Sequence, residues 1–392
     1  MAGVAVGWQV YALTHSTFAL GMVGLAQFLP MLALNLVVGQ VADRFNRKTV
    51  IGICQVAEGV TVAGLAVASY VARLHPVGIY TAVALIGAAR AFESPSTQAL
   101  IPTLVEEAML PSAIAWSTSA NQTALIVGPA LGGVLYAFGA HVPYSVCALL
   151  FAVAAAFSTS VRARRAAARR EPLTMESVFS GIRYIRSQRD ILGAISLDLF
   201  AVLLGGATAL LPAFAKDVLH TGPWGLGLLR LSPAVGALTC SVVLAHHPIR
   251  RRAGPIMFSA VIVFGLATIT FAVSRSLILS VGTLCILGAA DVVSVVIRAS
   301  LVQLQTPDAM RGRVSAVNSL FIGSSNQLGE FESGITASWF GLVSATVIGG
   351  VGSILVALLW TRLFPELRRL ESLTEVLVAD TGDSASSDGS SL

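Results

Sequence analysis

Long apolar runs, separated by short polar stretches, follow one another along almost the whole chain. Each run has about 20 residues, which is the length that crosses the hydrocarbon core of a bilayer as a helix. Strands of a membrane barrel would be about half as long and would alternate strictly, so the runs predict helices. The runs are 19–41, 50–72, 77–100, 113–137, 143–161, 191–214, 225–245, 255–274, 277–297, 314–336 and 341–361. The pattern therefore predicts an all-α membrane protein with eleven complete spans.

The chain begins with a further apolar segment, MAGVAVGWQVYAL, which ends before the polar stretch THSTF. Its 13 residues supply roughly half of a membrane crossing at about 1.5 Å per residue. The segment lacks the basic start and the small-residue cleavage site of a signal peptide. We interpret it as the outer half of a first membrane helix. Its inner half is missing because the start codon lies upstream of Met1 or because the gene is truncated.

Lysine and arginine accumulate in short cytoplasmic loops, so their distribution indicates how the spans are oriented. If residues 42–49 lie inside, alternate loops place 20 of the 25 bases inside. These are Arg44, Arg47, Lys48, eight bases from Arg162 to Arg189, Arg250, Arg251, Arg252, Arg298, Arg311, Arg313, Arg362, Arg368 and Arg369. The remainder are Arg73, Lys216, Arg230 and Arg275, outside or at the outer edge, and Arg90 within a span. We therefore expect a multi-pass protein of the cell (inner) membrane with a cytoplasmic C-terminus.

A basic stretch divides the chain into two halves of six spans each. We expect an N-terminal bundle over 1–161, a cytoplasmic linker over 162–190, a C-terminal six-helix bundle over 191–362, and a cytoplasmic tail over 363–392 that is disordered at its end. Within the linker, apolar residues at helical spacing predict an amphipathic helix that lies along the anionic inner leaflet. The halves also match weakly at an offset of 201 residues, with Ala108 opposite Ala309 and Gly128 opposite Gly329. Such internal repetition is typical of transporters.

Composition excludes several classes of protein. With 55% hydrophobic residues and a mean hydropathy of +0.80, the chain has more apolar surface than globular cores could bury. The net charge of +5 follows from membrane orientation and does not indicate nucleic-acid binding. The four cysteines (Cys54, Cys147, Cys240 and Cys285) lie in apolar runs without metal-ligand spacing, so we expect no metal and no cofactor. The chain also lacks a G-x-x-x-x-G-K-[ST] loop and a Ser, His and Asp set with a site to serve, so we expect no enzyme.

An acid and three bases stand together in GQVADRFNRKTVI, between the second and third helices. Their pattern resembles the signature that the major facilitator superfamily carries at this place, through Gly39, Asp43, Arg44, Arg47 and Lys48. The resemblance implies a cytoplasmic gating latch, which holds in one conformation and releases in the other. Asn46 stands where the family usually has glycine, and because asparagine accepts a left-handed conformation we expect the turn to be kept. An ordinary basic loop is the alternative, but it requires no particular acid or glycine.

A single arginine, Arg90, stands in the middle of a predicted span, in GAARAFESPSTQALIP. Its charge is costly in lipid unless an acid or water offsets it. The residue resembles the fourth-helix arginine that proton-coupled exporters of the superfamily use beside a proton-carrying acid. Glu93 lies three residues on, on the same helix face, and is a candidate partner. The alternative is a structural ion pair that fixes helix packing.

Glycine and proline recur in ALIVGPALGGVL of the fifth helix. The residues that resemble the glycine–proline motif of the superfamily's antiporters are Gly128, Pro129, Gly132 and Gly133. Small residues four positions apart let two helices meet closely, and proline allows a bend. Small-residue packing in an ordinary membrane bundle is the alternative.

Other ionisable residues inside spans are functional candidates, because charges in lipid are rarely kept without a function. The further candidates for proton coupling are Glu58, Asp198, Asp291 and Glu330, with Glu332 close by. Polar side chains that could line a cavity, or equally pair one helix with another, are Gln27, Asn121, Gln122, Asn326 and Gln327.

Phrases along nearly the whole chain are similar to one branch of the superfamily, the branch of the enterobactin exporter and related secretion effectors. They include GWQVYALTHSTFALGMVGLAQFLP, RAFESPSTQALIPTLV, SNQLGEFESG and LFPELRRL. The resemblance implies the major facilitator fold and proton-driven export of a siderophore-like or drug-like compound by alternating access. We expect a monomer whose partners are a small-molecule substrate, protons and the lipid bilayer. The alternatives are an importer or facilitator of the same fold, and a non-transporting membrane protein or truncated remnant.

The interpretation of the first segment makes a genomic prediction. If the start codon lies upstream, the preceding DNA should encode, in frame, about 10 to 15 mostly apolar residues with bases before them. Sequencing the genomic region tests this, and an in-frame stop codon directly upstream would favour a damaged gene.

Overall fold

The computed structural model describes residues 1–161, 175–249 and 251–370, and in these residues it is helical without strands. The N-terminal half begins with the short helix α1 (Ala2–Thr14). Five long helices follow: α2 (Thr17–Arg44), α3 (Arg47–Tyr70), α4 (Pro76–Leu104), α5 (Leu110–Tyr136) and α6 (His141–Ser160). A 3-10 turn, η1 (Glu107–Met109), precedes α5.

The C-terminal half follows a short amphipathic helix, α7 (Met175–Ser187). Its seventh span is divided into α8 (Arg189–Gly205), η2 (Ala207–Leu210), α9 (Leu211–Ala213) and the π-helical turn η3 (Phe214–Val218). The remaining helices are α10 (Pro223–His246), α11 (Ala253–Val273), α12 (Leu277–Gln305), α13 (Asp308–Phe340), α14 (Leu342–Leu363) and α15 (Pro365–Arg368).

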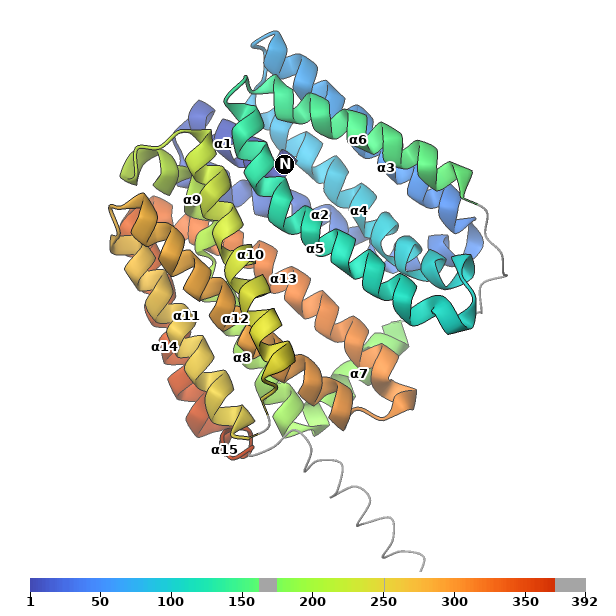
Figure 1. The fold of residues 1–392 in the computed structure, drawn as a ribbon, viewed down its shortest axis with the longest axis vertical. Coiled ribbons are helices and arrows are strands. Elements are labelled where there is room, and N and C mark those ends of the chain that lie inside the picture. The colour runs from blue at the N-terminus through green and yellow to red at the C-terminus, as the bar shows by residue number, and fades with distance from the viewer. Residues whose placement is uncertain (162–174, 250, 371–392) are drawn as a thin grey trace, which may run out of the picture.

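These elements confirm the all-α membrane fold. Each of the eleven predicted runs corresponds to a helix or, for 191–214, to the divided stretch that begins with α8. Within the described residues, eight stretches are long and apolar enough to cross a membrane. Helices α4, α5 and α13 are as long but more polar, and they contain several of the candidate site residues. Figure 1 shows α1–α6 and α8–α14 as two bundles that lie side by side.

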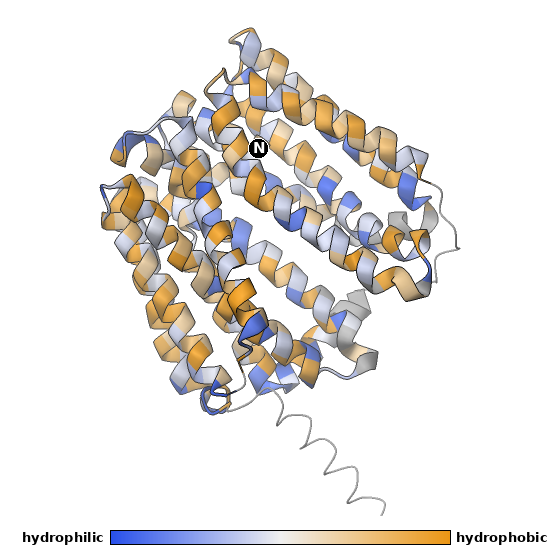
Figure 2. Cartoon of the chain, viewed as in Figure 1, coloured by the Kyte–Doolittle hydropathy of each residue, from blue (hydrophilic) through white to orange (hydrophobic). Residues whose placement is uncertain are grey.

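The two bundles present apolar surface on their outer helices. Large side chains that protein leaves exposed include Leu149 and Phe157 on α6, Ile278 on α12 and Leu355 on α14. Figure 2 shows apolar positions along the length of α6, α11 and α14, with hydrophilic positions gathered near helix ends. So much exposed apolar surface is what a bilayer covers.

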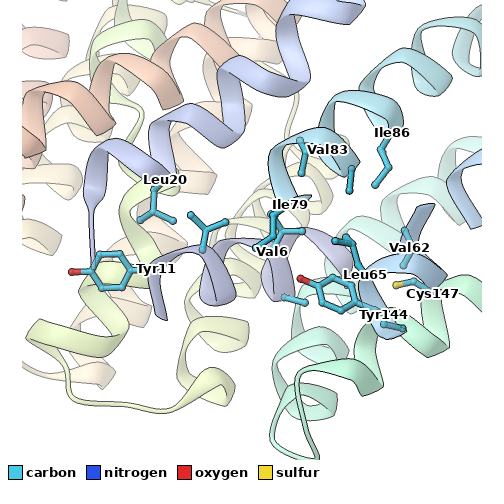
Figure 3. Packing of buried hydrophobic residues seen from close by; sticks show 14 of the residues in the cluster. Val6, Tyr11, Leu20, Val62, Leu65, Ile79, Val83, Ile86, Tyr144 and Cys147 are labelled. Carbon is cyan, nitrogen blue, oxygen red and sulfur yellow. The ribbon is translucent and has the colours of Figure 1, made fainter. Parts of the chain in front are cut away.

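Helix α1 lies against the N-terminal bundle and joins its core. Val6 and Tyr11 of α1 pack among Leu20, Leu65 and Ile79 from three following helices, as Figure 3 shows. Gln9 adds polar links to this apolar contact, because its side chain donates to Ser69 Oγ at 3.0 Å and accepts from the Tyr144 hydroxyl at 2.8 Å. The short helix is therefore held by both packing and hydrogen bonds.

The seventh span breaks at two adjacent glycines, which the hydropathy pattern does not predict. At Gly206 the backbone leaves the helical region, with φ −66° and ψ 47°. A Cβ on Gly206 would lie 3.0 Å from the Gly329 carbonyl oxygen of α13, and one on Gly205 would lie 2.6 Å from the Phe264 ring. Glycine is therefore required there by close approach, and the break opens the helix backbone in the middle of the bundle.

Helix α7 is amphipathic, and protein covers part of its apolar face, while Phe179 on the same helix is 57% exposed. Ile182 and Ile185 pack against Ile191, Val302 and Val314 of the C-terminal bundle. The expectation that this face lies in the inner leaflet is therefore wrong for these two side chains. The preceding linker residues 162–174 and the tail residues 371–392 lie outside the described residues.

The two ends of the molecule differ. We call the end with the α2–α3, α10–α11 and α14–α15 connections the basic end, and the end with the α1–α2, α5–α6 and η3–α10 connections the far end. In Figure 1, α5 and α10 lie close together at the far end and diverge toward the basic end. A Cβ on Gly133 would lie 2.8 Å from Gly227 Cα, and one on Gly21 would lie 3.0 Å from Gly334 Cα. The halves therefore meet through glycine contacts near the far end.

The basic end is more open along α5. Successive residues from Ile114 to Leu125 are exposed, including Trp116, Asn121 and Gln122. Because these residues cover every face of the helix, this part of α5 has little protein around it on any side. The structure is therefore closed at the far end and open at the basic end.

The glycine contacts predict that Gly133→Val weakens closure of the far end, because a Cβ there would lie 2.7 Å from the Pro223 carbonyl oxygen. Gly64→Val is the matched control, since a Cβ on Gly64 meets nothing within 4 Å. Spin labels at the exposed positions Phe138 and Trp224, in a background without native cysteines, report the separation of α5 and α10. We expect a longer distance in Gly133→Val and no change in Gly64→Val, whereas identical distances in both variants would contradict the closure contact.

Candidate functional site

A cavity of about 300 Å³ lies in the C-terminal half beside the break in the seventh span. Its walls are mostly apolar and include Val202, Phe264, Leu284 and Leu287. Its polar lining consists of Thr208 of η2, Asp291 of α12, and Asn326 and Glu330 of α13. The volume is at the lower end of the range of about 300–1,000 Å³ that small-molecule sites occupy. The sequence candidates Asp291, Asn326 and Glu330 are thus brought together.

A smaller pocket adjoins this cavity and reaches Asp198 of α8. The two share Val202, Phe264 and Asp291, so the Asp291 side chain borders both. Asp198 forms an ion pair with Arg298 of α12, and their side chains are 9% and 4% exposed. Because both side chains are buried and each neutralises the other, Asp198 is a paired charge.

A second acid of this cavity, Glu330, interacts electrostatically with Arg230 of α10. The side chains of Arg230 and Glu330 both approach the N-terminal half at positions where that half has a glycine. A Cβ on Gly7 would lie 3.4 Å from an Arg230 guanidinium nitrogen, and one on Gly24 would lie 3.0 Å from Glu330 Oε2. Glycines in α1 and α2 therefore leave room for two charged side chains of the opposite half.

Arg230 is a site residue that the sequence reasoning missed. It was expected at the outer edge, but it lies about two turns inside α10 and its Nε is buried without a hydrogen-bond partner. The presence of a single arginine within an apolar run was the signal in the sequence that could have identified Arg230 as a site residue.

The N-terminal half contains a second set of charged groups. Arg90 of α4 pairs with Glu58 of α3, with 3.4 Å between Nε and Oε1. The Arg90 side chain is 54% exposed and that of Glu58 is 1% exposed, so the arginine extends from a buried acid into space that protein does not fill. Glu93, the partner that helix spacing suggests, instead accepts a hydrogen bond from Gln55 Nε2 at 2.9 Å. Gln55 in turn accepts from Ser158 of α6 at 2.8 Å.

The structure describes part of the latch signature. Arg47 donates from Nη1 to the Ala99 carbonyl oxygen at 2.9 Å, which links the start of α3 to the end of α4. Gly39, Asp43 and Arg44 have helical backbone at the end of α2, but the side chains of Asp43 and Arg44 are not among those that the structure describes. Which groups pair with Asp43 therefore stays a prediction, and no partner of Lys48 is assigned.

Asn46 differs from the expected left-handed turn. Its φ of −65° and ψ of 117° are extended, and its Oδ1 accepts from the Lys48 backbone N–H at 3.2 Å. The residue therefore caps the N-terminus of α3, which is a preferred role of asparagine. The signature turn is made with a side-chain cap in this chain, and a left-handed backbone is not needed.

The fifth-helix motif lies at the contact between halves. Gly133 approaches Gly227 of α10, as described for the far end, while Gly128 and Gly132 approach Met1 at the start of α1. Pro129 is part of the same contact, because its carbonyl oxygen would lie 3.1 Å from a Cβ on Gly227. The motif thus joins α5 to both α1 and α10.

The remaining polar candidates are dispersed. Asn121 and Gln122 are exposed on the open part of α5, and Gln27 contacts α4 through its backbone, which lies 2.5 Å from the place of a Cβ on Gly87. Asn326 donates to the Ile322 carbonyl oxygen at 3.0 Å, and Gln327 Oε1 is buried without a hydrogen-bond partner. Glu332 accepts from Thr336 at 2.7 Å.

One further contact between the halves has no counterpart in the sequence reasoning. The Tyr11 hydroxyl of α1 donates to the carboxylate of Asp217 in η3, and Lys216 lies 5.8 Å from the Tyr11 ring centre. The contact closes the far end beside the glycines. Within the described residues, no group of three or more His, Cys, Asp and Glu is arranged to hold a metal ion.

Comparisons with known proteins agree with this geometry. The family model described as transmembrane secretion effector matches residues 1–379. The chain is 28% identical over 380 residues to the enterobactin exporter EntS of Citrobacter koseri, which covers 94% of this chain and 89% of the relative.

Two solved structures share the fold at low sequence identity. A mutant of the nucleoside transporter NupG has a TM-score of 0.70 and 15% identity, covering 92% of this chain and 94% of that one. A bacterial homologue of the human lysosomal transporter Spinster, in an inward-facing and unoccupied conformation, also has a TM-score of 0.70, with 13% identity, covering 96% of this chain and 95% of that one. The chain therefore belongs to the transmembrane secretion effectors, multi-pass membrane proteins of the major facilitator superfamily.

Proposed function

We propose that this chain is a secondary active transporter that exports a small organic compound in exchange for protons. Membership of a family of secretion effectors and similarity to enterobactin exporters support export of a siderophore-like or drug-like substrate. The observation that carries the proposal is the arrangement of two bundles that meet at the far end and open at the basic end, with a charged pair inside the first bundle and a cavity inside the second. This is what one state of an alternating-access cycle requires.

The orientation of this cycle follows from the distribution of bases. Arg47, Lys48, Arg251, Arg252 and Arg362 cluster at the basic end, which by the positive-inside rule faces the cytoplasm. In the proposed orientation the structure is inward-open, and the C-terminus is cytoplasmic. The protein works as a monomer of the inner membrane, with a bundle domain over 1–161, a linker over 162–190 and a second bundle over 191–362.

The Arg90–Glu58 pair suits proton coupling in the N-terminal half. A guanidinium stays protonated in a protein, so the pair changes only when Glu58 gains or loses its proton. Protonation of Glu58 removes the charge that holds Arg90, and the exposed arginine is then free to turn toward the open space. In this proposal a proton from outside drives the change between the inward-open and outward-open states. The proton acts on the Arg90–Glu58 pair as a unit, because protonation of Glu58 also releases Arg90.

The proposed role of Arg90 predicts that removal of its guanidinium uncouples export from the proton gradient. We expect Arg90→Ala and Arg90→Lys both to lose gradient-driven export, because lysine is a point charge without the planar fork of donors of a guanidinium. Glu58→Gln should uncouple transport from the gradient, whereas Glu93→Gln should be milder, because Glu93 accepts a neutral hydrogen bond from Gln55.

The measurement is uptake into inverted vesicles with and without a pH gradient, with enterobactin and the dye ethidium as probes. Parental uptake and parental pH dependence in Arg90→Ala would remove the coupling role. Accumulation in the opposite direction, in right-side-out vesicles, would instead indicate an importer, and uptake that never exceeds equilibration would indicate a facilitator.

The latch predicts a defect in switching. Asp43→Asn keeps the shape of the side chain and removes its charge, so we expect reduced transport with normal membrane insertion. The balance of inward-open and outward-open states should shift, because a charge that stabilises one state is missing. Spectroscopic distances across the basic end measure that balance, and values equal to those of the parent protein would speak against the latch.

A further inference from the structure

Asp291 differs from the other acids inside the spans. Glu58 pairs with Arg90, Asp198 with Arg298, and Glu330 interacts with Arg230. Asp291 lies about halfway along α12, is largely enclosed by protein, and has no hydrogen-bonding or ionic partner among the residues that the structure describes. An isolated carboxylate in such a place is costly unless a proton or a cation neutralises it.

The space in front of Asp291 is large enough for a ligand. The side chain borders both the 300 Å³ cavity and the smaller pocket beside it. The rest of the cavity lining is mostly apolar and includes the Phe264 ring, while Thr208 and Asn326 supply a hydroxyl and an amide. A cavity of this kind fits a compact molecule with an apolar body and one polar head.

The charges around the cavity leave a net negative charge. From α8 the Asp198 charge is offset by Arg298 of α12, and from α13 the Glu330 charge faces Arg230 of α10. The other lining residues of α10, α11 and η2, such as Pro233, Phe264 and Thr208, carry no charge. The charges within the Asp198–Arg298 and Glu330–Arg230 pairs cancel, so one negative charge, that of Asp291, remains. One monovalent cation would neutralise it.

We propose that this cavity is a subsite for a small organic ammonium ion, with Asp291 as the residue that binds the ammonium head. The subsite rests on the proposed function, because it assigns a substrate class to a transporter. Its apolar walls, which include Phe264, hold the body of the ligand. A neutral or anionic compound of equal size leaves the carboxylate without a partner and binds less well.

The same carboxylate makes protons competitors of the ligand. A proton on Asp291 and an ammonium ion beside it each neutralise one charge, so binding of one excludes the other. Acidification should therefore weaken ammonium binding, and ammonium binding to a protonated site should release a proton. Such mutual exclusion at one group is what exchange of a cation for a proton requires.

Equilibrium binding to the purified full chain in lipid nanodiscs tests the subsite without requiring transport. The probes are phenethylammonium, its neutral isostere 2-phenylethanol and the anion 3-phenylpropionate, titrated by calorimetry. We expect the ammonium probe to bind at least about tenfold more tightly than the other two, because only it pairs with a buried carboxylate. Asp291→Asn should remove that preference, and Asp291→Glu should keep it.

Asp190→Asn is the matched control, because it is the same chemical change in the same half but outside the cavity lining. It should bind the ammonium probe like the parent protein. Equal affinities for ammonium and alcohol, or an unchanged preference in Asp291→Asn, would overturn the subsite. If Asp291→Asn does not fold, the comparison of the three probes on the parent protein decides alone.

The outcome is separable from that of the proposed function. A protein that binds the ammonium probe selectively but never moves enterobactin or ethidium against a gradient would contradict proton-driven export and leave the subsite intact. A protein that exports ethidium with a pH gradient but shows no selective binding of phenethylammonium would leave export intact and exclude the subsite.

Discussion

A charge inside a bilayer must be balanced close by, and this constraint organises the centre of the molecule. Each half contains a buried acid that is paired with an arginine on a neighbouring helix, Glu58 with Arg90 and Asp198 with Arg298. In each pair the partners come from different helices, so the pair both removes a cost of a few kcal/mol and fixes two helices against each other. The pairs differ in their access to open space, because Arg90 is half exposed and Arg298 is buried. The first is therefore suited to change during a cycle and the second to hold its bundle together.

Close glycine contacts bring the halves together at the far end, beside apolar contacts in which Val4 of α1 packs in a cluster with Phe214 and Leu226 of the C-terminal half. Gly133 meets Gly227 and Gly21 meets Gly334, so backbone lies on backbone where the halves close. The same principle places Arg230 and Glu330 against glycines of α1 and α2, which can withdraw and leave the two charges in water. In the alternating-access account, opening of the far end then exposes a pair that the present state seals.

Hydropathy along the chain was sufficient to predict the helices, because a span needs an apolar run whatever its neighbours are. It could not predict which charges pair. Helix spacing favoured Glu93 as the partner of Arg90, but the orientation of α3 against α4 brings Glu58 instead, 32 residues away in sequence. Arg230 was misplaced for a similar reason, since only the packing of α10 on α1 shows that it lies inside the span. The break at Gly206 also depends on a tertiary contact, the approach of α13, which no local pattern contains.

Alternating access requires that the two ends of the molecule never open together. Spin-label pairs on or directly beside α5 and α10 measure this, with Phe138 and Trp224 at the far end and Trp116 and His246 at the basic end. The distances are recorded for both pairs in alkaline and in acidic buffer, with the protein in nanodiscs. Alternating access driven by protonation predicts opposite changes, so that conditions that lengthen one distance shorten the other. Distances that lengthen together, or that ignore pH at both ends, would contradict alternating access driven by protonation.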